Sequence, residues 1–418
     1  METTVLRCFM ARSKSLWSIQ VRFVLKRWAL TICLGGLVWS TPAAATDPLP
    51  SFVVDLAESS VSGLSSGAYM AGQFHVAFSG SLKGAAIIAG GPYGCARGQL
   101  PVALGQCMQT GFGAPNSAAL LALAEDLEQQ GRIDPLANLV DDRVYIFSGT
   151  KDDTVVPAVV DQTVAFYRLA GVAEASIRYV DDQAAGHAFI TEDQGGACDV
   201  TARPFINDCD YDQAGDLLEH IYGPLALPVA TAGGNLIEFD QSAFLSDPTS
   251  HGLDETGFVY IPAACAAGER CRVHIAFHGC KQTTELIGDR FRSQTGYWRW
   301  ADGNRLIILY PEAHATPANP NSCWDWWGYD DPNYATRTGR QMAAVHAMLL
   351  RLAGTTEPSA ACPGQEATNW QHWLAGRAFL CGWWFCAVGS GDQLGLAWSP
   401  TTLFEQSNGD FSSSGCGL

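Results

Sequence analysis

The chain has 418 residues with 42 acidic and 25 basic side chains, which gives a net charge of −17. Such an acidic surface repels nucleic acid and anionic membranes, so we exclude a nucleic-acid-binding role. With 47% hydrophobic and only 16% charged residues, the composition is that of a globular protein with one large domain and a small one.

The first 45 residues have the pattern of a secretory signal peptide. Basic residues precede the apolar run 29–39, which is too short to span a bilayer, and Ala43-Ala44-Ala45 supplies a cleavage site. We predict cleavage after Ala45, and an uncleaved N-terminal anchor is the alternative. Cleavage removes six basic residues and one acidic residue and leaves a net charge of −22. We therefore predict a secreted protein, periplasmic or extracellular, without membrane association after cleavage.

The cysteines support export. Twelve of the 14 lie beyond residue 45, and several form close pairs, a spacing that suits disulfides in an oxidising compartment. The alternative is a metal site, but the CGWWFC segment has no further C-x-x-C pair or histidine at zinc spacing. We predict disulfides and no metal. The close pairs are Cys95/Cys107, Cys198/Cys209, Cys265/Cys271 and Cys381/Cys386.

Residues 46–223 alternate between strand and helix patterns. Short apolar, β-branched runs that end in glycine or polar turns are typical of buried strands, and helical spacing of Ala, Leu and Val separates them. This alternation predicts a parallel sheet with crossover helices. The expected strands are 82–91, 142–149 and 176–182, and the expected helices are 117–130 and 157–171.

The second block, 224–354, continues the same pattern with strands expected at 257–263, 271–279 and 304–312 and an amphipathic helix at 336–354. These strands extend one sheet, so we predict a single catalytic domain over 46–354. The remainder, 355–418, opens with a linker and carries five tryptophans among many glycines. We predict that it forms a small, disulfide-rich C-terminal segment.

Near the start of the domain, Gly63-Leu64-Ser65-Ser66-Gly67 matches the G-x-S-x-G pattern of a nucleophile elbow. Its glycines permit the tight strand-to-helix turn that exposes the serine hydroxyl. Strand-like sequence precedes the motif and helix-like sequence follows it. The pattern alone is a weak signal in a chain rich in glycine and serine, so Ser65 needs partners before it is a credible nucleophile.

A serine hydroxyl is activated by a base, which an acid orients. His187 lies in a loop directly after the expected strand 176–182, unlike the histidines that fall within helices or strands. Asp152 follows the strand 142–149, although the adjacent Asp153 is an alternative acid. The order Ser65, Asp152, His187 is the order found in α/β-hydrolases.

An oxyanion hole requires two backbone N–H groups, one from the residue after the nucleophile, here Ser66. Nothing before Ser65 supplies the second. The suitable segment, VHIAFHGCKQT, lies far downstream, and we propose the Cys280 amide as the donor. Its side chain is expected in a disulfide, with Cys323 as a candidate partner, and His278 is expected to shape the turn. Strands that usually come first would then come last, as in a circular permutation.

Five separated motifs, GLSSGAYMA, SGTKDDTVVP, AGHAF, FHGCKQT and SCWDWWGY, together resemble secreted poly(3-hydroxybutyrate) depolymerases of the type with a single catalytic domain. The resemblance covers roughly 50–350 and implies an α/β fold, a circularly permuted α/β-hydrolase with a mostly parallel sheet flanked by helices. It implies that Ser65 attacks a polyester carbonyl and forms an acyl-enzyme, with no metal or organic cofactor. We expect a monomer.

The loop SCWDWWGY carries Trp324, Trp326 and Trp327. We expect these tryptophans to line a groove for an apolar, uncharged polymer, and burial in the core is the alternative for at least one of them. Two other functions remain open at this point. One is a secreted carbohydrate esterase of the feruloyl or acetylxylan type, which would carry the same triad, and the other is a non-catalytic polymer-binding protein.

Overall fold

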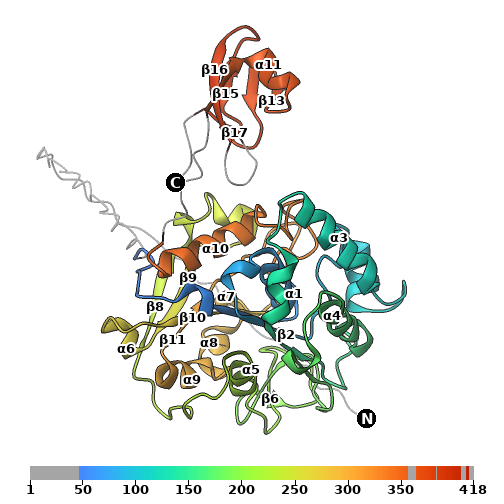
Figure 1. The fold of residues 1–418 in the computed structure, drawn as a ribbon, viewed down its shortest axis with the longest axis vertical. Helices are drawn as coiled ribbons and strands as arrows, with labels where there is room; N and C mark the ends of the chain where they lie inside the picture. Colours follow the sequence, from blue (N-terminus) through green and yellow to red (C-terminus); the bar gives the residue numbers. More distant parts are fainter. Residues whose placement is uncertain (1–46, 356–363, 383, 406–410, 414–418) are drawn as a thin grey trace, which may run out of the picture. The chain divides into compact units, whose positions relative to one another are not determined.

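The computed structural model describes residues 47–355, 364–382, 384–405 and 411–413 (Figure 1). The predicted signal peptide lies outside the described residues, as do Cys362 and Cys416. Within the described ranges, no helix has both the length and the apolar character needed to cross a membrane. The proposed boundary between 46–354 and 355–418 stays a prediction, and the two segments are described separately below.

The central sheet contains eight strands, which are β1 (Ser60–Leu64), β2 (Gly84–Ile88), β3 (Arg143–Phe147), β4 (Ile177–Val180), β8 (Asn235–Asp240), β9 (Thr256–Ile261), β10 (Arg272–Phe277) and β11 (Leu306–Tyr310). Their spatial order is β4-β3-β2-β1-β10-β11-β9-β8. All pairings from β4 to β11 are parallel, and β9 pairs antiparallel with both of its neighbours. The strand carrying the predicted elbow, β1, is therefore central.

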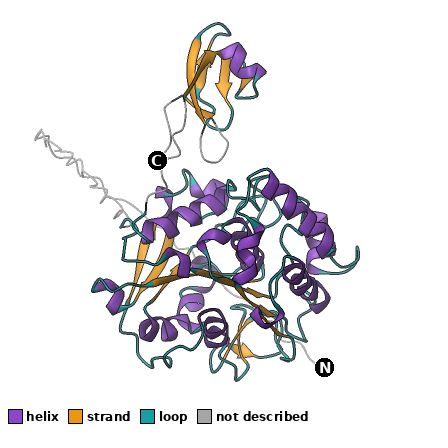
Figure 2. Cartoon of the chain, viewed as in Figure 1, coloured by secondary structure: helices purple, strands orange, loops and turns teal. Residues whose placement is uncertain are grey.

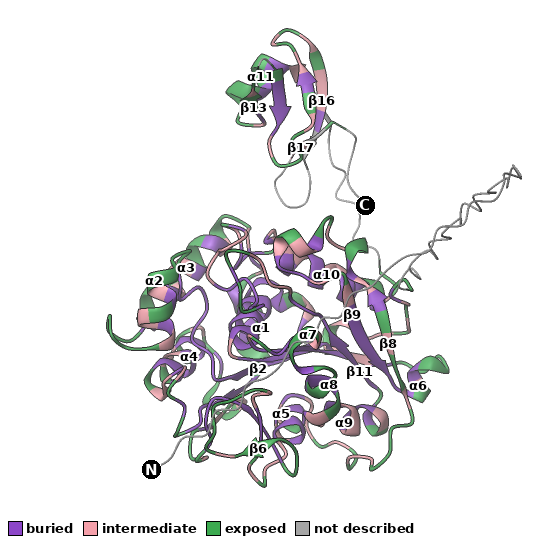
Figure 3. Ribbon diagram, turned by 180° about the vertical axis from the view of Figure 1, so that it is seen from behind, coloured by how far each residue is buried: buried purple, intermediate pink, exposed green. Residues whose placement is uncertain are grey.

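Helices cover both faces of this sheet (Figure 2). The longer ones are α1 (Ser66–Ala77), α3 (Ser117–Gln129), α4 (Pro157–Leu169), α5 (Gln213–Tyr222), α9 (Tyr297–Asn304) and α10 (Arg340–Leu352). Successive strand residues point to opposite faces. Val144 accordingly joins the buried cluster that α1, α3, α4 and α10 share, whereas Tyr145 joins Leu217 of α5 and Trp300 of α9 on the other face. Figure 3 shows the central strands of the sheet buried between these layers, whereas the edge strand β8 is largely exposed.

Shorter elements fill the connections. A second, three-stranded sheet has the order β5-β7-β6 and lies between β4 and α5 in the chain. The short helices and strands within 46–354 are α2 (Leu100–Val102), β5 (Phe189–Thr191), β6 (Gly196–Ala197), β7 (Ile206–Asp208), α6 (Ala263–Ala266), α7 (Thr284–Ile287) and α8 (Arg290–Gln294). This small sheet and strand β8 were not expected from the sequence, because their runs are short or lack apolar alternation.

The strand order confirms the circular permutation. If strands are counted from β8, then β10 is the third strand and β1 the fifth, and the loop after the third strand is where α/β-hydrolases place one oxyanion donor. All six strands predicted from apolar runs are present and each is shorter than predicted, although β9 begins one residue earlier than expected. The helix predicted at 336–354 begins only at Arg340, after Gly339.

All five disulfides among the described residues match the sequence analysis: the four close pairs and Cys280–Cys323. The C-terminal segment, taken by itself, forms two three-stranded sheets, β12-β16-β17 and β13-β14-β15, with one helix. Its elements are β12 (Gly364–Thr368), α11 (Asn369–Leu374), β13 (Ala378–Cys381), β14 (Trp384–Ala387), β15 (Gln393–Gly395), β16 (Pro400–Glu405) and β17 (Phe411–Ser412).

Candidate active site

Ser65 occupies the turn between β1 and α1, with φ 56° and ψ −120°. A positive φ is uncommon for a residue with a side chain and costs on the order of 1–3 kcal/mol, so the surrounding structure must hold it. The Ser65 N–H donates to the carbonyl of Ile88 at the end of β2, at 3.0 Å. Its side chain is half-buried, whereas Ser66 is buried. This is the strained geometry of a nucleophile elbow.

The two glycines of the motif are required by close backbone approach. A Cβ on Gly63 would lie 2.1 Å from the carbonyl oxygen of Gly67. A Cβ on Gly67 would lie 2.4 Å from the carbonyl oxygens of both Phe277 and His278. The first turn of α1 therefore packs directly against the end of β10, which brings the turn after β10 to the elbow.

The predicted acid and base meet. His187 Nδ1 lies 2.7 Å from Asp152 Oδ2, and both side chains are buried. The other carboxylate oxygen accepts the N–H groups of Thr154 and Val155, at 2.8 and 2.9 Å. Because a carboxylate only accepts, Nδ1 carries the proton in this pair and Nε2 is left as an acceptor. The side chain of Asp153 is exposed.

Neighbouring loop residues hold the backbone at His187. The N–H of Gly186 donates to the carbonyl of Cys198, at 2.8 Å, and the N–H of His187 donates to Thr201 Oγ1, at 2.9 Å. A Cβ on Gly186 would lie 2.8 Å from the carbonyl of Val200, so the backbone at Gly186 is in direct contact with the backbone at Val200. The backbone of the predicted base is thus fixed from one side by residues 198–201.

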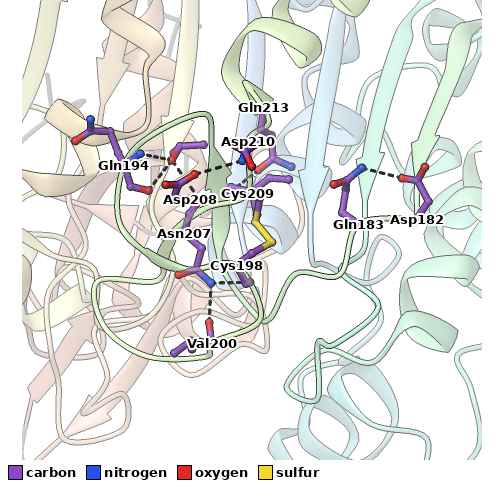
Figure 4. The surroundings of a disulfide bond; sticks show 12 residues. Asp182, Gln183, Gln194, Cys198, Val200, Asn207, Asp208, Cys209, Asp210 and Gln213 are labelled. Atoms are coloured by element: carbon purple, nitrogen blue, oxygen red, sulfur yellow. Dashed lines mark hydrogen bonds between the residues drawn. A yellow bond between two sulfur atoms is a disulfide. The ribbon is translucent and has the colours of Figure 1, made fainter.

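Residues 198–201 are themselves anchored, as Figure 4 shows. The disulfide Cys198–Cys209 closes this loop. The buried Asn207 amide donates to the carbonyls of Cys198 and Val200, at 3.0 and 2.7 Å. Sequence analysis predicted the disulfide but not the contribution of Asn207, because nothing in the local pattern distinguishes it from a surface asparagine.

The turn after β10 lies against Ser65. A Cβ on Gly279 would lie 3.4 Å from Ser65 Cβ and 3.2 Å from the carbonyl of Leu64. The adjoining Cys280 is bonded to Cys323. Its N–H has no hydrogen-bond partner among the described residues, and the Ser66 N–H, at the first position of a helix, has none within the helix. The turn that carries Cys280 therefore lies against Ser65 through Gly279, and the oxyanion roles of the Ser66 and Cys280 N–H groups stay predictions.

His278 is part of the structure of this turn. Its Nδ1 lies 2.7 Å from the carbonyl of Gly279, and Nε2 accepts the N–H of Ala313 at 3.0 Å. Burial lowers the pKa of His278 to about 4, so the imidazole is neutral at physiological pH. Both ring nitrogens are thus occupied by backbone groups.

The structure therefore joins the predicted residues in two groups, Asp152 with His187 and Ser65 with the turn at Gly279. Among the described residues, no hydrogen bond links the Ser65 hydroxyl to His187. Catalytic hydrogen bonds are often longer before substrate binds, and both groups lie at the carboxyl edge of the same parallel strands.

The expectation that Trp324 lines a substrate groove is wrong. Its side chain is fully buried, packs against Phe277 with ring centroids 4.9 Å apart, and donates from its indole N–H to the carbonyl of His278 at 2.9 Å. Each of these contacts supports the turn next to Ser65. A fully buried ring cannot contact a polymer, so Trp324 belongs to the core.

The other two tryptophans lie nearer the surface. Trp326 stacks on Tyr69 of α1, with centroids 4.1 Å apart and planes 17° apart, and is only 5% exposed. Trp327 is half-buried and meets Trp326 edge-on at 5.5 Å. Of the three rings, Trp327 therefore offers the most surface for a ligand.

A buried carboxylate organises this tryptophan loop. Asp325 Oδ1 accepts the N–H groups of Gly328 and Tyr329, and Oδ2 accepts those of Asp330 and Asp331, at 2.7–3.3 Å. Burial raises the pKa of Asp325 to about 7. Sequence analysis read this loop only for its tryptophans and missed the aspartate that folds it, although the D-W-W-G-Y-D-D run has the turn residues such a loop requires.

A cleft of about 710 Å³ lies elsewhere, between α3 and residues 328–336, with Tyr93, Leu123 and Tyr334 among its lining residues. None of the predicted catalytic residues lines it.

Among the described residues there is no group of three or more His, Cys, Asp or Glu side chains placed to hold a metal ion.

Comparison with known proteins places this geometry in a family. No protein-family model matches the chain. The chain is 44% identical over 323 residues to the poly(3-hydroxybutyrate) depolymerase of Delftia acidovorans, covering 74% of this chain and 63% of that protein. It is 39% identical over 326 residues to the polyhydroxybutyrate depolymerase of Talaromyces funiculosus, covering 74% of this chain and 93% of that protein.

Solved structures agree. The chain is similar to the crystal structure of PHB depolymerase from Penicillium funiculosum, with 36% identity and a TM-score of 0.68 over 74% of this chain and all of that one. It is equally similar to a serine-to-alanine variant of a PHB depolymerase complexed with an R3HB trimer. The fold is thus that of these enzymes, and the chain belongs to the poly(3-hydroxybutyrate) depolymerase family.

Proposed function

We propose that the protein is a secreted serine esterase that hydrolyses poly(3-hydroxybutyrate) or a related short-chain polyhydroxyalkanoate to oligomers and monomers. The observation that carries the proposal is the buried Asp152–His187 pair at the same sheet edge as a strained Ser65 elbow, in a chain of this family. The chain covers 63% of the length of the Delftia relative, so we infer its activity from the site and not from that protein's name alone.

In this proposal, Ser65 is the nucleophile and His187 Nε2 is the base. The imidazole takes the serine proton as Oγ attacks an ester carbonyl of the polymer, and Asp152 stabilises the imidazolium that forms. The tetrahedral intermediate collapses when His187 donates the proton to the leaving alcohol. Water, activated by the same imidazole, then releases the 3-hydroxyacyl group from Ser65.

The negative charge of the intermediate falls on the former carbonyl oxygen. The N–H groups of Ser66 and Cys280 are the proposed donors to it, and preorganised donors of this kind contribute about 10²–10³ in kcat each. His278 and the Cys280–Cys323 disulfide hold the second donor in place. Every step uses side chains and backbone of this chain, and we propose no cofactor.

Trp327, with Trp326 packed against it, is the proposed contact for the polymer. The polymer has no charge and offers methyl and methylene groups, which suit an indole surface. Secretion is supported by five disulfides among the described residues and by the signal-peptide pattern of 1–45. A carbohydrate esterase would share the triad, but the relatives at 44% and 39% identity are polyhydroxybutyrate depolymerases, which favours the polyester.

The test is hydrolysis of an amorphous poly(3-hydroxybutyrate) suspension, followed by loss of turbidity and by chromatography of the released hydroxyacids. Wild-type protein should clear the suspension, and Ser65→Ala should not. Feruloyl and acetylated-xylan substrates serve as comparisons. Release of ferulate or acetate without release of 3-hydroxybutyrate would favour the carbohydrate esterase, and full activity in Ser65→Ala would exclude the proposed nucleophile.

A further inference from the structure

A buried glutamine connects the turn beside Ser65 to the loop that supports His187. Gln282 is 1% exposed. Its Oε1 accepts the N–H of Gly279 at 2.6 Å, and its Nε2 donates to the carbonyls of Pro204 and Phe205, at 2.7 and 3.2 Å. One side chain thus makes three hydrogen bonds to two backbone segments. One segment lies 3 residues before Gln282 in the sequence, and the other lies 77 and 78 residues before it.

At one end, Gln282 fixes the turn that carries the Cys280 amide. It holds the N–H of Gly279, while the ring of His278 lies 2.7 Å from the Gly279 carbonyl. The carbonyl of Gly279 and the N–H of Cys280 belong to one planar peptide unit. Because both sides of Gly279 are held by side chains, the direction of the Cys280 N–H is set, and Gly279 lies directly against Ser65.

At the other end, Gln282 fixes the segment on which the His187 loop rests. The carbonyl of Phe205 that accepts from Gln282 also accepts the N–H of Phe189, at 2.9 Å. Phe189 begins β5, two residues after His187, and β5 pairs with β7, which begins directly after Phe205. The amide of Gln282 therefore holds the pairing that places the imidazole.

We propose that Gln282 is a positioning residue that sets the proposed oxyanion donor and the proposed base relative to each other. This inference rests on the proposed esterase function and assigns to Gln282 a role in the alignment of the active site. Acyl transfer needs the base and the oxyanion donors on the same reacting ester at once. A misplacement of about 1 Å costs about 10²-fold in rate, so a direct link between the two segments affects turnover more than binding.

The test variant is Gln282→Met, which keeps the side-chain length and removes all three hydrogen bonds. We expect kcat on a soluble ester such as p-nitrophenyl butyrate, normalised to active sites titrated with a phosphonate ester, to fall about 10- to 100-fold. We expect KM to change less than about threefold. A purely structural role would lower the fraction of folded protein but would leave kcat per titrated site unchanged.

Asn304 supplies a matched control. It is also buried, its Nδ2 donates to the carbonyls of Ala226 and Trp300, at 3.0 and 2.9 Å, and its Oδ1 accepts the N–H of Ala226 at 2.8 Å. Asn304 ends α9 two residues before β11 begins, at the amino edge of the sheet, and its contacts involve none of the proposed catalytic segments. Asn304→Leu should lower the melting temperature about as much as Gln282→Met and leave kcat per site within about twofold of wild type.

Gln282→Glu covers the case in which the methionine variant does not fold. Glutamate still accepts the N–H of Gly279 but has no N–H for the carbonyls of Pro204 and Phe205, so we expect a fall in kcat here too. The inference is overturned if Gln282 variants keep kcat per site within twofold of wild type, or if Asn304→Leu loses as much. If Ser65→Ala stays active, the proposed function fails; if Ser65→Ala is inactive and Gln282 variants are unimpaired, only this inference fails.

Discussion

Replacement of Asp152 by asparagine tests the proposed acid with little disturbance to the fold. The asparagine carbonyl oxygen still accepts the two N–H groups that Asp152 Oδ1 accepts from Thr154 and Val155. Its NH₂ group then faces His187 Nδ1, at the 2.7 Å separation that the carboxylate now occupies. A donor at that place requires Nδ1 to accept, so the proton moves to Nε2 and the imidazole can no longer deprotonate Ser65.

The expected loss follows from this change of tautomer. In the triad pattern, an asparagine at this place lowers kcat about 10⁴-fold, which corresponds to about 5.5 kcal/mol of transition-state stabilisation. We expect Asp152→Asn to lose about 10³- to 10⁴-fold in kcat on p-nitrophenyl butyrate, with KM nearly unchanged and a melting temperature close to that of wild type.

Asp153→Asn is the control, because Asp153 is adjacent in the chain but exposed. It should keep kcat within about twofold of wild type. More than a tenth of wild-type activity in Asp152→Asn would show that Asp152 is not the acid that orients His187. So would an equal loss in Asp153→Asn, which would move the role of the acid to the neighbouring residue.

Three further predictions concern stability. Trp324→Ala should lower the free energy of unfolding by about 3–5 kcal/mol in urea denaturation because it empties a fully buried site; a loss below 1 kcal/mol would show that the ring is not in the core. Replacement of both Cys280 and Cys323 by alanine removes the disulfide that closes a loop with a sequence separation of 43, and should lower the free energy of unfolding by about 4 kcal/mol. An unchanged urea midpoint would show that this disulfide does not stabilise the fold. Burial lowers the pKa of His278 to about 4 and that of His274 to about 3, below the 6.5 of the unfolded chain, so only the unfolded chain takes up their protons as the pH falls below 6.5. Each histidine therefore lowers the stability by about 2 kcal/mol at pH 5, whereas Asp325 and Glu312, whose pKa values burial raises to about 7, act in the opposite direction. His278→Gln removes one of the two histidines, so the advantage of wild type over this variant in unfolding free energy should shrink by about 2 kcal/mol from pH 7 to pH 5, and a constant difference would count against the prediction.

Local sequence determines the features that the sequence analysis predicted well. The elbow at Ser65 follows from two glycines that close backbone approach requires, and Asp152 and His187 follow from the rule that functional side chains come directly after parallel strands. The early position of the elbow also predicted the permutation, because an oxyanion turn had to come from later in the chain. The strand order confirms that reading.

Burial and long-range contacts explain what sequence could not predict. Trp324 and Trp327 stand in one loop with the same composition around them, yet one is fully buried and the other half-buried, and only packing against β10 separates them. The bonds from Gln282 to Pro204 and Phe205 join residues that are 78 and 77 positions apart, and no local pattern encodes such a pair. The small sheet β5-β7-β6 and the hydrogen bonds of Asn207 also depend on contacts between separate segments, so no local sequence pattern predicts them.

The most direct test of the account is covalent labelling of the nucleophile. The purified protein is incubated with a p-nitrophenyl alkylphosphonate, whose phosphorus is attacked by an activated serine, and is then digested and mapped by mass spectrometry. We expect one phosphonate adduct per molecule, on the peptide that contains Ser65, with activity lost in proportion to labelling and no adduct in Ser65→Ala. An adduct on another residue with loss of activity, or full activity after complete labelling of Ser65, would contradict it.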